Sequence, residues 1–226
     1  MTRQHTPNLT AKDDIWTVIT AQRLTVASLL QQLSPDEWQR PSLCTGWTVH
    51  DVAAHLTMQQ LGLAAALGML ARWRGSLDQT IHDAACRRAA AWPPGQIIAT
   101  LRATAGARRH NPGITCLETL TDVLIHGQDI AIPLGHHHDM PPHAAAAAAT
   151  RVLTMRWPPP LPAAREMTGF RLTATDISWS TGDGPHVTGP IHALLLVATG
   201  RLIALPQLTG EGAPVLTAHL APPQPG

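Results

Sequence analysis

The sequence predicts an α+β protein, in which a bundle of helices over residues 1–156 precedes a small α+β module over residues 169–226. Apolar side chains recur at helical spacing through most of the first part, whereas strand-like alternation begins only near the end. Between the two parts, Trp157-Pro-Pro-Pro-Leu-Pro162 cannot continue a helix and favours an extended spacer. Residues 157–168 are therefore predicted to form a proline-rich linker.

The helices of the first part are predicted from apolar spacing and from signals at their ends. Between residues 13 and 33 the apolar side chains lie three and four positions apart, as on one face of a helix. Thr48 is a predicted N-cap, because Asp51 three residues later can complete a capping box. Further helices are predicted over residues 49–73, 78–91, 96–109, 114–132 and 144–156.

Short elements are predicted for the C-terminal module. Residues 169–179 alternate in polarity and contain β-forming side chains, which predicts a strand that leads to a second one at 177–180. Gly182-Asp183-Gly184 is typical of a hairpin turn, and residues 190–198 are predicted to form a short apolar helix. The pattern leaves open the type of the two last apolar pieces, residues 202–208 and 215–220.

Composition limits the binding partners and the cellular location that the sequence predicts. The formal net charge is +1, so the overall charge points neither to nucleic acid nor to an anionic membrane. The three cysteines include no Cys-x-x-Cys pair, which argues against a disulfide framework and a thiolate zinc knuckle. No secretory signal is predicted, and the longest apolar run, residues 61–71, is too short to cross a bilayer. A cytoplasmic location is therefore expected.

Three residues that are distant in the sequence form a candidate metal site. Asp122 and His126 are four residues apart in a predicted helix, so their side chains project from the same face. His55 lies on the apolar face of another predicted helix. Two imidazoles and one carboxylate from facing helices can hold a divalent metal and leave a coordination position open. The alternative is that each histidine is a core residue that makes its hydrogen bonds within the protein and binds no metal.

Other polar side chains have two interpretations each. Asp129, three residues after His126, could orient a ligand imidazole, or it could stabilise the turn that ends the helix. Cys44 precedes a predicted helix N-terminus, where it could be a nucleophile with His50 as its base, although an inert core cysteine is the simpler interpretation. The adjacent histidines 136–138 could bind metal, but they lack the fixed geometry of a catalytic centre.

Four segments resemble a known family. Residues 41–56, Pro-Ser-Leu-Cys-Thr-Gly-Trp-Thr-Val-His-Asp-Val-Ala-Ala-His-Leu, resemble the N-terminal signature of the mycothiol-dependent maleylpyruvate isomerase family, within the DinB-like metalloenzyme superfamily. Residues 120–130, Leu-Thr-Asp-Val-Leu-Ile-His-Gly-Gln-Asp-Ile, resemble its second signature. Residues 173–180 and 193–201 resemble parts of its small C-terminal module. The resemblance spans nearly the whole chain and keeps the order of the family.

The resemblance implies both a fold and a ligand set. The fold is an up-down-down-up four-helix bundle with an appended α+β domain, and the metal is usually zinc. Carried over to this sequence, the ligands are His55, Asp122 and His126. The founding isomerase has a glutamate at the carboxylate position, so the shorter Asp122 should bring the metal nearer to its helix. Nickel and iron also occupy such a site of two histidines and one carboxylate.

The resemblance also implies chemistry. Mycothiol, a sugar-based thiol of high-GC actinobacteria, would act as a metal-bound thiolate that adds to a small electrophile, giving isomerisation or S-transfer. The strong preference for Arg over Lys in this chain agrees with a GC-rich genome. Arg201 matches a family arginine that could act in catalysis by binding a carboxylate, or it could cap a helix.

Two other functions and one assembly state are left open by the sequence. The chain could be a non-catalytic metal-binding or regulatory protein on the same scaffold. It could also be a metal-dependent hydrolase, for which Asp129 is the clearest general base. Exposed apolar positions on the bundle could support a homodimer.

Overall fold

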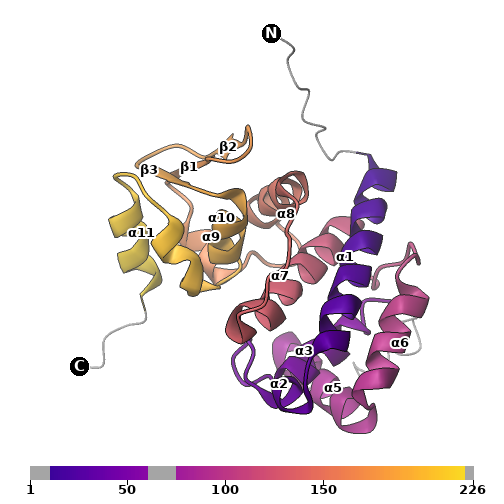
Figure 1. Cartoon of the computed structure of the whole chain (residues 1–226). Coiled ribbons are helices and arrows are strands. Elements are labelled where there is room, and N and C mark those ends of the chain that lie inside the picture. The colour runs from indigo at the N-terminus through magenta and orange to yellow at the C-terminus, as the bar shows by residue number, and fades with distance from the viewer. Residues whose placement is uncertain (1–10, 61–74, 222–226) are drawn as a thin grey trace. The chain divides into compact units, whose positions relative to one another are not determined.

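The computed structural model describes residues 11–60 and 75–221 (Figure 1). These residues form two compact units, one over Ala11–Asp139 and one that begins at Met140. The part of the second predicted helix over residues 61–73, and with it the longest apolar run, lies outside the described residues. Among the described helices, none combines the length and the apolar character needed to cross a membrane.

The first unit is helical. α1 packs against α6 and α7, and α3 packs against α5, α6 and α7, so the helices surround a shared apolar core. Ile19, Leu30, Val52 and Leu124 are fully buried in it, as their spacing predicts. The helices are α1 (Lys12–Gln32), α2 (Pro35–Gln39), α3 (Val49–Leu56), α5 (Leu77–Ala91), α6 (Pro94–Thr104) and α7 (Cys116–Leu134).

Capping boxes fix where α3 and α7 begin. The Thr48 hydroxyl accepts a hydrogen bond from the Asp51 backbone N–H at 3.2 Å, and the Asp51 carboxylate accepts one from the Thr48 N–H at 2.9 Å. Thr115 and Glu118 form the same box at the start of α7. Each box satisfies donors that a helix N-terminus leaves unpaired. The predicted N-cap at Thr48 is therefore confirmed.

The end of α7 differs from the prediction, which placed a loop from Pro133 onward. The helix continues to Leu134 and ends at Gly135, whose φ of 71° is the left-handed conformation of a helix C-cap. Because Pro133 has no N–H, it cannot bond to the Asp129 carbonyl one turn earlier. The Leu43 N–H donates to that carbonyl instead, at 3.2 Å, and this bond ties the loop that precedes α3 to α7.

The second unit begins earlier than the sequence suggested. α8 packs on α10 through buried alanines, which allow two helices to approach closely. α8 therefore belongs with the C-terminal elements and not with the bundle, and the proline-rich stretch lies inside this unit. Its elements are α8 (Pro142–Thr154), α9 (Pro162–Glu166), β1 (Arg171–Ala174), β2 (Ser180–Thr181), β3 (His186–Gly189), α10 (Ile191–Ala198), η1 (Leu202–Gln207) and α11 (Ala213–Leu220).

A three-stranded sheet completes this unit. The strand order is β2-β1-β3, with β2 antiparallel and β3 parallel to β1. The first strand is shorter than predicted, and the predicted turn at residues 182–184 connects β2 to β3. Gly184 has a φ of 124°, and a Cβ there would overlap the Gly169 carbonyl, so the tight turn requires glycine. The predicted helix over 190–198 is present as α10.

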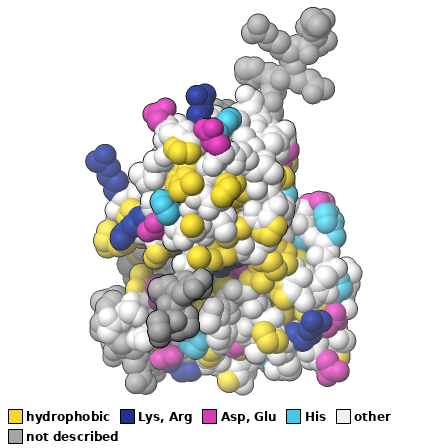
Figure 2. Space-filling view, turned by 90° about the vertical axis from the view of Figure 1, so that its left-hand side faces the viewer, with side chains coloured by type: hydrophobic (Ala, Val, Ile, Leu, Met, Phe, Trp, Pro, Cys, Tyr) yellow, Lys and Arg dark blue, Asp and Glu magenta, His cyan; other side chains and the backbone are white. Residues whose placement is uncertain are grey.

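Charged side chains of both signs are interspersed on the molecular face that Figure 2 shows. Hydrophobic side chains on that face lie between them. This distribution agrees with the nearly balanced composition of 16 basic and 15 acidic residues.

Candidate metal centre

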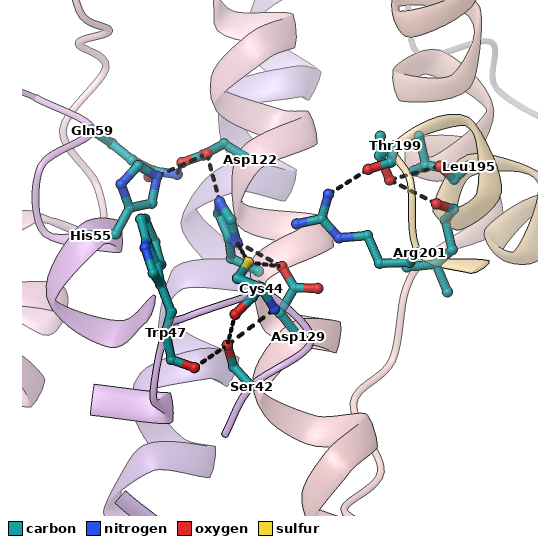
Figure 3. A network of polar contacts seen from close by, with 12 residues as sticks. Ser42, Cys44, Trp47, His55, Gln59, Asp122, Asp129, Leu195, Thr199 and Arg201 are labelled. Atoms are coloured by element: carbon teal, nitrogen blue, oxygen red, sulfur yellow. Dashed lines mark hydrogen bonds and ion pairs between the residues drawn. The ribbon is translucent and has the colours of Figure 1, made fainter. Parts of the chain in front are cut away.

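The structure brings His55, Asp122 and His126 together. His55 is on α3, and the other two residues lie one turn apart on α7, which packs against α3. The Oδ1 atom of Asp122 lies 3.2 Å from the Nε2 atom of each imidazole (Figure 3). One ligand atom from each residue lies within 4.8 Å of the others. The three side chains therefore converge on a single carboxylate oxygen.

This spacing suits a tetrahedral cation. Two ligand atoms that each lie about 2.0–2.1 Å from a tetrahedral metal are roughly 3.3 Å apart. Asp122 Oδ1 is 3.2 Å from both imidazole nitrogens, which agrees with that value. Imidazole and carboxylate are also the donor types that zinc, nickel and iron accept. The residues present therefore fit a divalent metal ion.

The electrostatics of the three residues favour positive charge between them. Burial raises the pKa of Asp122, but the charges of His55 and His126 outweigh it and hold that pKa well below its usual value. Burial lowers the pKa of His126, but Asp122 opposes it and raises that pKa well above the usual value, with help from Asp129 and Cys44. A cation held by neutral imidazoles would be stabilised by the same carboxylate.

The Trp47 ring packs beside the imidazoles of both His55 and His126. Its ring centroid lies 5.2 Å from that of His55 and 6.2 Å from that of His126, nearly parallel to the latter. It also lies 5.8 Å from His82. An aromatic side chain at these distances restricts the rotation of the two imidazole rings and lowers the local polarity. No local pattern in the sequence marks Trp47 as a site residue, although it lies in the first family signature.

Asp129 lies behind His126. Its carboxylate is fully buried, and Oδ2 is 2.8 Å from His126 Nδ1. A carboxylate accepts hydrogen bonds, so the proton of a neutral His126 sits on Nδ1 and the Nε2 lone pair faces Asp122. This geometry favours the interpretation of Asp129 as an orienting residue over that of a charge at a helix end.

Cys44 joins the same cluster. Its Sγ atom lies 3.0 Å from Asp129 Oδ2 and 3.6 Å from His126 Nδ1. His50, which sequence spacing offered as a base for Cys44, places its Nε2 atom 3.0 Å from the Trp92 carbonyl instead. The neighbouring Leu43–Asp129 backbone bond explains why Cys44 reaches α7. Sequence alone offers no signal for that bond.

Arg201 lies in the second unit, just after α10. Its Nη1 atom donates to the Thr199 carbonyl at 2.6 Å, at the C-terminal end of that helix. This contact fits the helix-capping interpretation. A catalytic contact between Arg201 and a substrate carboxylate stays a prediction.

The three adjacent histidines have separate partners. His136 Nε2 lies 3.0 Å from Glu37 Oε1, and His137 Nε2 lies 2.7 Å from Asp139 Oδ1. His138 is buried, and neither ring nitrogen has a hydrogen-bond partner among the described residues. The run therefore does not form a shared metal site within the described part of the chain.

The burial of His138 predicts a pH-dependent stability. Burial lowers the pKa of His138 to about 4, although Asp139 opposes the shift. Between pH 6.5 and 4 the unfolded chain therefore binds more protons at this residue than the folded chain, and the free energy of unfolding falls as the pH falls. The expected loss from this residue between pH 7.5 and 5 is about 2 kcal/mol. Urea unfolding at both pH values should show a smaller loss in His138→Leu than in the wild type, and equal losses would contradict the assignment.

Comparisons with known proteins agree with this architecture. Residues 19–115 match the family model for the mycothiol maleylpyruvate isomerase N-terminal domain. A crystal structure of the mycothiol-dependent maleylpyruvate isomerase is similar, with a TM-score of 0.60 and 16% identity over 100% of this chain and 99% of the other. A histidine-to-alanine mutant of such an isomerase is similar as well, with a TM-score of 0.60 and 17% identity over the same shares. No curated protein matches the chain.

The predicted α+β class and the predicted family resemblance are both confirmed by these matches. The family model covers the segment that holds His55 and Trp47, and the fold match extends over Asp122 and His126. Residues 19–115 are thus similar to a mycothiol maleylpyruvate isomerase N-terminal domain, and the whole chain has a fold similar to that of the mycothiol-dependent maleylpyruvate isomerase.

Proposed function

We propose that this protein is a metal-dependent enzyme in which a low-molecular-weight thiol of the mycothiol type adds to a small electrophile. The result would be isomerisation of the electrophile or S-transfer, in which the thiol stays attached to it. The observation that carries the proposal is the convergence of two imidazole Nε2 atoms on Asp122 Oδ1 at 3.2 Å each. The match to a mycothiol maleylpyruvate isomerase domain supports the choice of thiol. The resemblance supports an enzyme, although maleylpyruvate itself is only one candidate substrate.

His55, Asp122 and His126 would hold the ion, with zinc as the first choice and nickel or iron as alternatives. The bound metal would lower the pKa of a coordinated thiol, so that a thiolate is present at neutral pH. Three protein ligands leave room for such an additional ligand. A reduced thiol as cosubstrate suits the cytoplasm, and none of the three cysteines forms a disulfide in the structure.

The side chains around the site then have distinct tasks. Asp129 keeps the Nδ1 proton on His126, and Trp47 shields the two imidazoles from water. The thiolate would add to a conjugated C=C bond of the electrophile, so that a C–S bond forms, the C=C π bond breaks and the electron pair moves onto the conjugated carbonyl. If the new C–C single bond rotates and the thiolate then leaves, the C=C bond forms again and the product is an isomer. If the adduct instead takes up a proton from solvent, the product is a thiol conjugate. In either case Arg201 is proposed to bind a carboxylate of the substrate.

The hydrolase alternative has weaker support. It needs a general base beside an attacking water, and Asp129 was the clearest candidate. Asp129 is fully buried and its Oδ2 atom already faces His126 and Cys44, on the side of the imidazole away from Asp122. That position suits a residue that orients a ligand better than one that activates water.

A thiol titration of the cobalt-substituted protein tests the proposal. Cobalt replaces zinc at such sites and reports its ligands by absorption. Addition of mycothiol should produce a sulfur-to-cobalt charge-transfer band that saturates at one thiol per chain, whereas glutathione should bind more weakly. A cobalt spectrum that does not respond to mycothiol would contradict thiol activation and favour a non-catalytic metal-binding role.

A further inference from the structure

Two successive buried hydrogen bonds connect α1 to the carboxylate of the candidate metal centre. The Arg23 Nε atom donates to Gln59 Oε1 at 3.0 Å, and the Gln59 Nε2 atom donates to Asp122 Oδ2 at 2.7 Å. Figure 3 shows the second of these contacts. Arg23 and Gln59 are only 2% and 5% exposed. None of the motifs in the sequence assigns a role to Arg23 or Gln59.

The two oxygens of Asp122 have different environments. Oδ1 faces the two imidazoles, whereas Oδ2 accepts the amide N–H of Gln59. A carboxylate that is free to rotate can bind a metal through one oxygen or through both. A hydrogen bond of 2.7 Å on Oδ2 opposes the second mode, because that oxygen would have to leave its donor. The contact therefore favours binding through Oδ1 alone.

Arg23 determines which way the Gln59 amide points. A guanidinium has donors and no acceptor, so it requires the amide oxygen, and the amide nitrogen is left to face Asp122. Arg23 is held in place because its Nη1 atom also donates to the carbonyls of Ala105 and Ala107, at 3.3 and 3.1 Å. The donor-to-acceptor direction of both hydrogen bonds, from Arg23 to Gln59 and from Gln59 to Asp122, is therefore set by the fixed guanidinium of Arg23.

The burial of this cation is costly. A buried guanidinium is stabilised only when its donors are paired, and Arg23 Nη2 has no partner among the described residues. Burial lowers the Arg23 pKa to about 10, and the Asp122 charge opposes that shift, so the side chain stays charged at neutral pH. An apolar residue at this position would avoid the cost, which suggests a role for Arg23 beyond packing.

We propose that Arg23 and Gln59 are positioning residues, which hold Asp122 so that it binds the metal through Oδ1 alone and leaves room for the thiol. This inference rests on the proposed function. Neither residue contacts the reacting atoms, and both act through Asp122. Partners of metal ligands commonly contribute 10- to 100-fold to metal affinity, so a measurable effect is expected.

The test compares Gln59→Leu with Gln60→Leu in the full-length protein. Gln60 is the adjacent glutamine, and its Nε2 atom donates to the Thr104 carbonyl and not to Asp122, so it is a matched control. Zinc affinity is measured by competition with a chromophoric chelator, and cobalt absorption reports the coordination number. Gln59→Leu should bind zinc about 10- to 100-fold more weakly, with less intense cobalt bands because the second carboxylate oxygen joins the metal. Gln60→Leu should match the wild type.

A second variant keeps the test decisive if Gln59→Leu does not fold. Gln59→Glu is nearly isosteric and retains an acceptor for Arg23, but it has no donor for Asp122. It should show the same change in the cobalt bands. If both Gln59 variants bind zinc as Gln60→Leu does and keep the wild-type cobalt spectrum, the positioning role is wrong while the metal site stands. If the wild type binds neither zinc nor cobalt, the proposed function fails, and this inference fails with it.

Discussion

Replacing His126 by alanine is expected to weaken zinc binding by more than about 100-fold, because loss of a ligand should exceed the 10- to 100-fold effect of losing a partner of a ligand. The substitution removes one of the two imidazoles that face Asp122 Oδ1 and leaves Asp129 without its histidine. His55→Ala should have a similar effect, since His55 Nε2 occupies the equivalent position on the other helix. Elemental analysis after dialysis should find less than one zinc per chain in both variants.

His82→Ala provides the control for these substitutions. The His82 ring also lies against Trp47, at 5.8 Å, but it is not among the three residues around Asp122 Oδ1. This variant should retain the zinc content of the wild type. Full zinc occupancy in both His55→Ala and His126→Ala would rule out the proposed ligand set.

Replacing Gly127 by alanine is expected to destabilise the protein by about 1–3 kcal/mol, the usual cost of overpacking a core. A Cβ at Gly127 would overlap the imidazole of His138. That ring is buried, and the His138 carbonyl is held by the Gln128 side-chain amide at 2.7 Å, so the ring has little freedom to move. Urea unfolding at pH 7.5 should show the lower free energy of unfolding.

Gly95→Ala separates this clash from helix propensity. Gly95 is also a helical glycine, on α6, but among the described residues a Cβ there would meet no atom within 4 Å other than its chain neighbours and its own helix backbone. Alanine is favoured over glycine inside helices by up to about 1 kcal/mol, so Gly95→Ala should be neutral or stabilising. A Gly127→Ala variant as stable as Gly95→Ala would show that the His138 ring does not need this space.

The helices and the three central residues could be predicted because their signals are local. Apolar spacing places α1, α5 and α7 to within a few residues, and the Thr48 capping box marks the start of α3. The spacing of Asp122 and His126 puts both side chains on one helix face. The position of His55 on the apolar face of another predicted helix, together with the family resemblance, supplies their partner. These inferences need no knowledge of how distant segments pack.

The remaining features depend on contacts between distant segments. Gln59 shares the inward face of His55, but its role depends on Arg23, which lies 36 residues earlier. Cys44 contacts Asp129 next to the point where the Leu43 N–H donates to the Asp129 carbonyl, for which Pro133 has no N–H to offer. By composition, the proline-rich stretch predicts the boundary between the two units. In the structure the buried alanines of α8 pack against α10, so the boundary lies before α8, between Asp139 and Met140. Each case depends on a partner that local sequence does not specify.

X-ray absorption spectroscopy of the zinc-loaded protein, with and without mycothiol, tests the central claim most directly. Before thiol is added, two imidazoles and oxygen ligands without sulfur are expected, because Cys44 lies on the Nδ1 side of His126 and away from Asp122. After addition, a sulfur neighbour should appear at about 2.3 Å from zinc. A sulfur neighbour present without thiol, or none after mycothiol is added, would contradict the account.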